Sequence, residues 1–112
     1  MTVSHQQSYT YILECLDGSW YTGWTNNLET RIHKHRQCKG AIYTRVRGVK
    51  ELVCAFVVAD KSTAMKLEYA IKQLSKKNKS NLVADAIAQA PSKILNFDII
   101  TVLTEAKNYD AP

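Results

Sequence analysis

The sequence contains no long apolar run, and this absence excludes a membrane-spanning helix. Crossing a bilayer takes about 20 consecutive apolar residues, and no stretch of the 112 residues approaches that length. Residues 1–8 also lack the basic-then-apolar order of a secretory signal. We therefore expect a cytoplasmic protein with no membrane partner.

Cysteine is scarce, and its spacing excludes a disulfide framework. The chain has three cysteines, an odd number, with no C-x-x-C pair that would suggest a zinc site. Cys15, Cys38 and Cys54 each stand where an apolar residue would serve, so we expect buried free thiols. Internal repeats, low-complexity stretches and linkers are absent as well. Residues 1–112 are therefore expected to form a single domain around one hydrophobic core.

Acidic residues are absent between Arg31 and Lys50, although this segment holds seven basic ones. The rest of the chain carries eight basic and ten acidic residues, so the net charge of +5 is concentrated in one segment. A block this one-sided creates a positive field suited to a polyanion such as nucleic acid. A solvated basic surface with no ligand would have the same composition, so the block alone does not establish binding.

The first third of the sequence predicts two strands joined by a tight turn. Residues 9–16 and 19–24 are rich in the aromatic and β-branched side chains that favour strands. Asp17-Gly18 between them is a turn signal. These features predict a β-hairpin.

The length of the hairpin loop decides on which face of the sheet two tyrosines lie. A two-residue loop would place Tyr11 and Tyr21 on opposite faces, because side chains alternate along a strand. A three-residue loop over residues 16–18, with Gly18 in a bulge, instead pairs Leu13 with Tyr21 and places both tyrosines on one face. A site shared by the tyrosines therefore requires the three-residue loop.

A helix is predicted after the hairpin, from polar caps at residues 25–27 to about Cys38, with Gly40 as its stop. Asn26 followed by Glu29 is a variant of the capping box. At 100° per residue the buried stripe of this helix contains Leu28 and Ile32. One edge of the stripe carries Arg31, His35 and Cys38. Arg31 and His35, four residues apart, are therefore expected to point together toward the sheet.

The middle of the sequence predicts a buried strand and a second helix. Residues 50–59 are almost continuously apolar, as in a central strand covered on both faces. A helix over residues 63–77 follows a cap at Asp60 or Ser62. Its apolar stripe contains Ala64, Leu67, Ile71 and Leu74, and Glu68 lies at the border of that stripe.

The end of the sequence predicts a third helix over residues 81–90, which ends at Pro91. The tail, residues 93–106, fits either an edge strand or a docked helix. The predicted order is β-β-α-β-α-α, an α+β fold with a small three-stranded antiparallel sheet flanked by helices.

Two tyrosine triplets and an ordered set of polar residues resemble the GIY-YIG nuclease family. The triplets are Tyr9-Thr10-Tyr11 and Tyr21-Thr22-Gly23, one on each predicted strand of the hairpin. They are followed, in the order of the family, by Arg31, His35, a Gly40-Ala41-x-Tyr43-Thr44-Arg45 loop and Glu68. The resemblance covers residues 9–79 and leaves residues 80–112 as a C-terminal helix and tail. It is greatest to short single-domain bacterial members and to the catalytic domain of structure-specific junction endonucleases.

The triplets depart from the family pattern at three positions. Tyr9 and Thr10 stand where the name of the family has Gly and Ile, and Thr22 replaces a second Ile. Both triplets keep their functional tyrosine, and the second keeps its glycine. Many members also use an asparagine after the metal-binding glutamate, but neither Asn78 nor Asn81 fits that place convincingly.

The resemblance implies metal-dependent hydrolysis of phosphodiester bonds in nucleic acid, with DNA as the expected substrate. Tyr11 would accept a proton from the attacking water, and Arg31 would bind the scissile phosphate through its guanidinium fork. Tyr21 and His35 would position the water or assist proton transfer. Glu68 would be the protein ligand of one Mg²⁺ or Mn²⁺ ion, whose other ligands are waters and phosphate.

The basic segment is the expected nucleic-acid surface of such an enzyme. Its residues are Lys34, Arg36, Lys39, Tyr43, Thr44, Arg45, Arg47 and Lys50. Taken singly, the site residues have ordinary roles, and Glu68 with Lys72 would form an exposed ion pair worth under roughly 0.5 kcal/mol. Two alternatives keep the same fold: a DNA-binding module without catalysis, and a catalytic subunit that needs a protein partner to supply substrate specificity.

Overall fold

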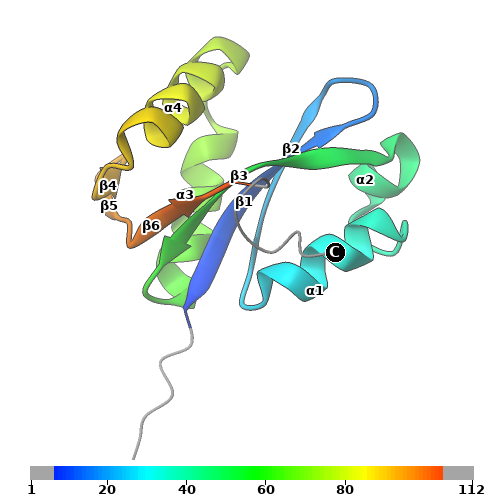
Figure 1. Cartoon of the computed structure of the whole chain (residues 1–112), viewed down its shortest axis with the longest axis horizontal. Coiled ribbons are helices and arrows are strands. Elements are labelled where there is room, and N and C mark those ends of the chain that lie inside the picture. Colours follow the sequence, from blue (N-terminus) through cyan, green and yellow to red (C-terminus); the bar gives the residue numbers. More distant parts are fainter. Residues whose placement is uncertain (1–6, 105–112) are drawn as a thin grey trace, which may run out of the picture.

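The computed structural model describes residues 7–104, in which strands and helices are mixed along the chain (Figure 1). The strands are β1 (Ser8–Cys15), β2 (Trp20–Thr25), β3 (Val49–Val58), β4 (Lys93–Ile94), β5 (Phe97–Asp98) and β6 (Thr101–Leu103). The helices are α1 (Leu28–Arg36), α2 (Ile42–Arg47), α3 (Lys61–Lys72) and α4 (Lys76–Gln89). No helix in this part of the chain is long and apolar enough to cross a membrane.

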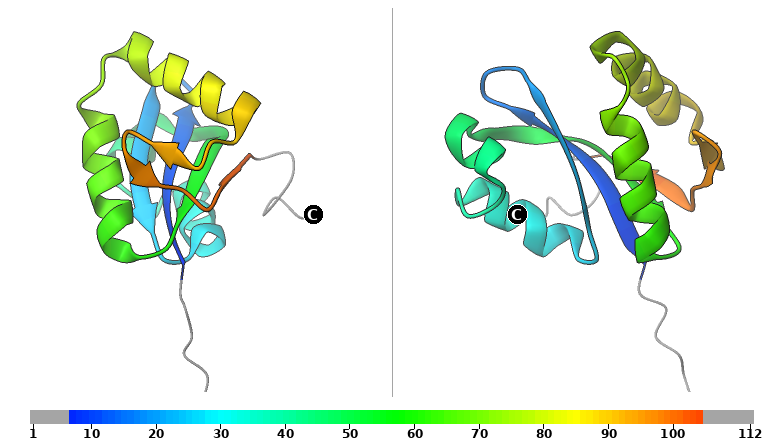
Figure 2. Two further views of the ribbon diagram at one scale, coloured as in Figure 1. Left: turned by 90° about the vertical axis from the view of Figure 1, so that its left-hand side faces the viewer. Right: turned by 180° about the vertical axis from the view of Figure 1, so that it is seen from behind.

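The main sheet separates two layers of helices. Its strand order is β2-β1-β3-β6, and all three neighbouring pairs are antiparallel. Helices α1 and α2 lie on one side of it, and α3 and α4 lie on the other (Figure 2). The predicted α+β class with an antiparallel sheet is confirmed. The predicted strand count is wrong, because the tail adds β6 beside β3 as a fourth strand.

The hairpin carries the three-residue loop that a shared tyrosine site requires. Leu13 pairs with Tyr21, and the amide of Cys15 donates to the carbonyl of Ser19 at 2.8 Å. Gly18 has φ +86°, a left-handed conformation that glycine adopts without steric cost. Tyr11 and Tyr21 therefore lie on the same face of the sheet, as predicted.

Helix α1 begins one residue later than the capping-box prediction. Asn27, rather than Asn26, is the N-cap, and its side chain accepts a hydrogen bond from the amide of Thr30. The side chain of Asn26 instead accepts from the hydroxyl of Ser8 at 2.8 Å. The helix ends at Arg36 rather than near Cys38. Cys38 is exposed, so the prediction of a buried thiol is correct for the other two cysteines and wrong for this one.

A break after α3 divides what the sequence predicts as one helix over residues 63–77. Asp60 caps α3 through the amide of Thr63, and α3 ends at Lys72. Ser75 then accepts from the amide of Asn78 and starts α4 five residues before the predicted third helix. The break lets α4 turn away and cover the end of the sheet near β6 (Figure 1).

The two faces of the sheet have separate cores. The core under α3 and α4 contains Ile12, Phe56, Leu67 and Ile71, all fully buried. The core under α1 is smaller and contains Tyr11, Leu13, Leu28, Ile32, Leu52 and Ala55. Burying an aliphatic or aromatic side chain contributes about 1.5–3 kcal/mol. The smaller core thus holds Tyr11 in a fixed place among apolar neighbours.

Candidate active site

Tyr11 and Tyr21 form the base of a polar cluster on the α1 face of the sheet. Their ring centroids are 6.3 Å apart. The side chain of Tyr11 is fully buried, whereas Tyr21 is half-buried. The site therefore presents one buried hydroxyl and one partly accessible ring on adjacent strands.

Gly23, which pairs with Tyr11 across β1 and β2, leaves room for the Tyr11 ring. A Cβ atom at this position would lie 2.5 Å from the Tyr11 hydroxyl and 3.0 Å from a ring carbon of Tyr21. Position 23 therefore requires glycine, because the Tyr11 hydroxyl lies directly over the backbone. Gly40 likewise lies directly against the ring of His35.

Helix α1 directs Arg31 and His35 onto the Tyr11 hydroxyl, as their four-residue spacing predicts. The Nε2 atom of His35 lies 2.8 Å from the Tyr11 oxygen, and the Nε of Arg31 donates to the same oxygen over 3.4 Å. His35 is fully buried and Arg31 is half-buried. Three side chains from two elements thus meet at a single oxygen atom.

Thr44 of α2 fixes the direction of the hydrogen bonds around His35. The Thr44 hydroxyl donates its only proton to the carbonyl of Ala41 at 3.0 Å, so it accepts from Nδ1 of His35 at 2.7 Å. His35 then carries its proton on Nδ1 when it is neutral. Its Nε2 is therefore the acceptor, and the Tyr11 hydroxyl donates to it.

Burial keeps both members of the Tyr11 and His35 pair neutral at pH 7. Burial raises the pKa of Tyr11 to about 12, against the opposing effect of the Arg31 hydrogen bond. Burial, together with a smaller effect of the Arg31 charge, lowers the pKa of His35 to about 4. The pKa of Arg31 is raised, first of all by its hydrogen bond to Tyr11. The resting site thus has a fixed cation beside a neutral phenol and a neutral imidazole.

Glu68 reaches the cluster from α3, on the other side of the edge strand β2. Its carboxylate forms an ion pair with Lys72 at 2.9 Å and is 20% exposed. The Lys72 ammonium lies 5.7 Å from the centre of the Tyr21 ring, and the charge of Glu68 is one of the smaller causes that raise the pKa of Tyr11. Glu68 is therefore near the tyrosines but is engaged by a neighbouring lysine.

The basic segment borders the cluster at Tyr43, and part of the charge of the segment is already paired. Arg47 contacts Asp17 at 3.2 Å, and Lys50 lies 4.0 Å from Glu14. The Tyr43 ring packs 5.8 Å from Tyr21, and the Arg47 guanidinium lies 3.9 Å above it. The side chains of Lys34, Arg36, Lys39 and Arg45 are exposed. Thr44, expected among the nucleic-acid contacts, is instead fully buried behind His35.

Glu68 offers a donor set that suits a well-hydrated divalent cation. Within residues 7–104 no three His, Cys, Asp or Glu side chains converge in a way that could enclose a metal ion. A single carboxylate suits a hard cation such as Mg²⁺, which keeps several waters and also binds substrate phosphate. The Lys72 ammonium shows that this carboxylate already attracts positive charge. The residues present therefore fit an open ion site and do not fit a protein cage.

Two features of the site are missing from the sequence prediction. The segment that contains Thr44 was predicted as a loop, but in the structure it forms helix α2. The second feature is Lys72, which the sequence suggested only as an ion-pair partner of Glu68 and which also lies beside Tyr21.

Comparison with known proteins identifies a family for the part of the chain from β1 to the first half of α4. Residues 7–81 match the family described as the GIY-YIG catalytic domain. The chain is 51% identical over 76 residues to the UPF0213 protein BH0048 of Halalkalibacterium halodurans, covering 68% of this chain and 81% of that protein. It is 45% identical over 83 residues to the UPF0213 protein PC1_0597 of Pectobacterium carotovorum, covering 74% of this chain and 84% of that protein. These names state no activity.

A solved structure is also similar to the chain. The solution NMR structure of the UPF0213 protein BH0048 from Bacillus halodurans has 49% sequence identity and a TM-score of 0.47. The match covers 70% of this chain and 83% of the chain in that structure.

Proposed function

The chain belongs to the GIY-YIG catalytic domain family, whose members are nucleases, and from this premise we propose that it hydrolyses phosphodiester bonds in DNA. The observation that carries the proposal is the convergence of Arg31 and His35 on the hydroxyl of Tyr11. A fixed cation and a directed proton acceptor at one hydroxyl are the groups that hydrolysis of a phosphodiester needs.

Arg31 is the group that binds the scissile phosphate. Its guanidinium is half-buried, permanently charged and matched in shape to phosphate oxygens. Within residues 7–104 no carboxylate forms an ion pair with it, so its charge is available to an incoming anion. Phosphate binding also removes one cause of the low pKa of His35, since the Arg31 charge that lowers this pKa becomes compensated.

Tyr11 and His35 then move a proton away from the attacking water. The Tyr11 oxygen accepts the water proton while its own proton passes to Nε2 of His35, and the water oxygen bonds to phosphorus as the ester P–O bond breaks. Because burial raises the pKa of Tyr11 to about 12, the phenol would not act as a preformed base in this proposal. Because Tyr11 accepts one proton as it gives up the other, the coupled transfer needs no free phenolate. The leaving oxygen takes a proton from solvent.

Glu68 would hold a divalent cation, Mg²⁺ or Mn²⁺, at the β2 edge of the site. When bound, the cation would neutralise charge on the phosphoryl oxygens and make its coordinated water more acidic. Lys72 must release the Glu68 carboxylate for the ion to bind. The half-buried Tyr21 ring lies 5.7 Å from the Lys72 ammonium that pairs with this carboxylate, and the Tyr21 hydroxyl would position the water.

The test is cleavage of supercoiled, single-stranded and branched DNA, and of RNA, by the purified protein with Mg²⁺, Mn²⁺ or EDTA. We expect metal-dependent nicking that is lost in Glu68→Gln and in Arg31→Lys, since lysine keeps the charge but not the fork. Glu51→Gln is the matched control, because Glu51 is exposed on β3. Equal loss in Glu51→Gln and Glu68→Gln would contradict a role for Glu68.

The same experiment separates the two alternative functions. Salt-sensitive DNA binding without cleavage under any metal condition would identify a binding module. Cleavage that appears only when a purified protein partner is added would identify a partner-dependent catalytic subunit.

A further inference from the structure

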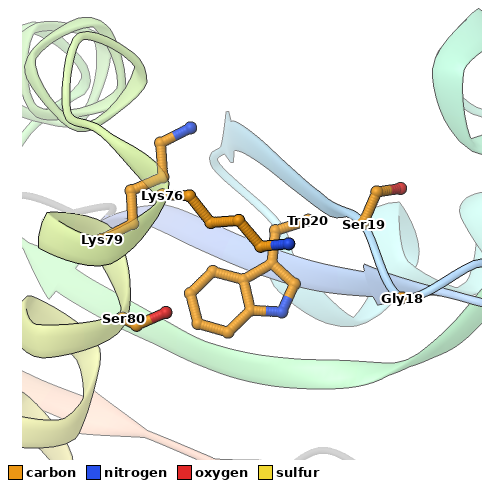
Figure 3. Close-up of a pocket in the computed structure, with 6 residues that line it drawn as sticks. All are labelled: Gly18, Ser19, Trp20, Lys76, Lys79 and Ser80. Atoms are coloured by element: carbon orange, nitrogen blue, oxygen red, sulfur yellow. The ribbon is translucent and has the colours of Figure 1, made fainter.

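A pocket lies on the opposite side of the sheet from the tyrosine site, between the hairpin loop and the start of α4. Its volume is about 340 Å³, and it is lined by Gly18, Ser19, Trp20, Lys76, Lys79 and Ser80. Figure 3 shows the Lys76 side chain extending over the Trp20 indole and the Lys79 side chain extending away from the ring, with Ser80 on the α4 side and Ser19 on the hairpin side. Ligand pockets usually measure about 300–1,000 Å³, so this one has room for a group no larger than about one nucleotide.

The two lysines of the pocket lack acidic partners. Among residues 7–104, neither Lys76 nor Lys79 forms an ion pair. They are three residues apart and therefore share one face of α4. The first turn of α4 contains no acidic residue, and lysines there are disfavoured by the helix dipole. An anion bound in the pocket would reduce the repulsion between the two ammonium groups. It would also interact favourably with the positive end of the α4 dipole.

The pocket is connected to the tyrosine site by the edge strand β2. Trp20 and Tyr21 are consecutive residues of β2, so their side chains lie on opposite faces of the sheet. β2 has no neighbour on its outer side in the main sheet. Lys72, beside the Tyr21 ring, precedes Lys76 by four residues. Lys72 at the end of α3 lies beside Tyr21, and Lys76 at the start of α4 lines the pocket beside Trp20, so a lysine accompanies each of these two consecutive β2 side chains.

We propose that this pocket binds one nucleotide of a single-stranded segment of the nucleic-acid substrate, with its base against Trp20 and its phosphate between Lys76 and Lys79. An indole face with adjacent ammonium groups is the combination that binds single strands without sequence preference. The Ser80 hydroxyl adds a hydrogen-bond donor for a phosphate oxygen, whereas the Ser19 hydroxyl already donates to the carboxylate of Asp17. This inference rests on the proposed function, because the bound strand is the one that extends from the scissile phosphate at Arg31.

Trp20 fluorescence tests the proposal directly. The chain has two tryptophans, so Trp24→Phe leaves Trp20 as the only indole. We expect saturable quenching of Trp20 when a single-stranded oligonucleotide is added in EDTA, which prevents metal-dependent cleavage. Lys76→Ala with Lys79→Ala should weaken binding about fivefold or more and reduce the slope of log affinity against log salt by about one to two.

A charge-matched double variant is the control. Lys66→Ala with Lys77→Ala removes the same charge from exposed positions of α3 and α4 that do not line the pocket. The proposal that the pocket binds a nucleotide would be overturned if the two double variants weakened binding equally, or if Trp20 were not quenched, even if the protein cleaves DNA. Quenching with selective loss in the pocket variant, but no cleavage, would support the pocket and reject the proposed nuclease activity.

Discussion

The hydroxyl of Tyr11 donates a hydrogen bond to Nε2 of His35 over 2.8 Å, although the two residues are 24 positions apart. The direction of this bond follows from Thr44, which accepts from the other ring nitrogen of His35 and passes its own proton to Ala41. Because of these hydrogen bonds, the Nε2 atom of His35 is a proton acceptor that faces the candidate site.

Replacing Thr44 by valine removes the group that sets this direction while keeping the shape of the side chain. The buried Nδ1–H of His35 would lose its acceptor, at a cost of about 1–3 kcal/mol in the free energy of unfolding. We expect the nitrogen chemical shifts of His35 to show a changed tautomer and the nicking rate to fall about tenfold or more. Thr44→Ser keeps the hydroxyl and should restore both. An unchanged tautomer and rate in Thr44→Val would show that Thr44 does not position His35.

The low pKa of His35, caused first by burial, predicts that the protein loses stability in mild acid. The unfolded chain takes up a proton at this residue near pH 6.5, whereas the folded chain does so only near its pKa of about 4. Unfolding therefore becomes easier as the pH falls from 6.5 to 4, by at most about 3 kcal/mol. Denaturant unfolding across this range measures the effect. His35→Gln should show a flatter profile, and parallel profiles for the two proteins would contradict the lowered pKa.

Gly23→Ala tests the close approach of Tyr11 to the backbone of β2. The added methyl group would lie 2.5 Å from the Tyr11 hydroxyl, so the ring must move away from Arg31 and His35. We expect a loss of about 1–3 kcal/mol in the free energy of unfolding. At a temperature where the variant remains folded, its nicking rate should still be lower than that of the wild-type protein. A variant with wild-type stability and rate would show that the ring does not occupy this position.

If Glu68 holds a divalent cation as proposed, Lys72 would compete with that cation for the carboxylate, because its ammonium lies 2.9 Å away. Lys72→Gln should therefore lower the Mn²⁺ concentration needed for half-maximal cleavage by about two- to fivefold, the range expected for a partly exposed ion pair. Lys66→Gln on the same helix is the control. A higher Mn²⁺ requirement in Lys72→Gln would show that Lys72 assists the ion rather than excluding it.

The hairpin and α1 could be predicted from the sequence because their determinants are local. The turn at Asp17-Gly18 was predicted, but the sequence left a two-residue and a three-residue loop open. The structure has the three-residue loop, and the shared face of Tyr11 and Tyr21 then follows from the alternation of side chains. Helical periodicity placed Leu28 and Ile32 in the buried stripe of α1 and His35 at the edge of that stripe, and the structure buries all three.

The remaining elements depend on contacts that the sequence pattern does not encode. β6 is three residues long and is defined by its pairing with β3, more than 40 positions earlier. Helix α2 has six residues and no side-chain cap. The contact between His35 and Thr44 follows a left-handed residue at Cys38, φ 61°, for which the sequence carries no glycine signal. The division between α3 and α4 had one visible sign, the serine at position 75 that caps the new helix.

The measurement that tests the proposed site most directly compares two tyrosine variants of β1. Tyr9 and Tyr11 lie on the same face of the strand, but only Tyr11 bonds to Arg31 and His35. Supercoiled DNA should be nicked in Mn²⁺ by the wild-type protein and by Tyr9→Phe at similar rates, and by Tyr11→Phe about 10²- to 10⁴-fold more slowly. Equal rates for the two variants, or no nicking by the wild-type protein, would contradict the assignment of Tyr11 to a phosphodiesterase site.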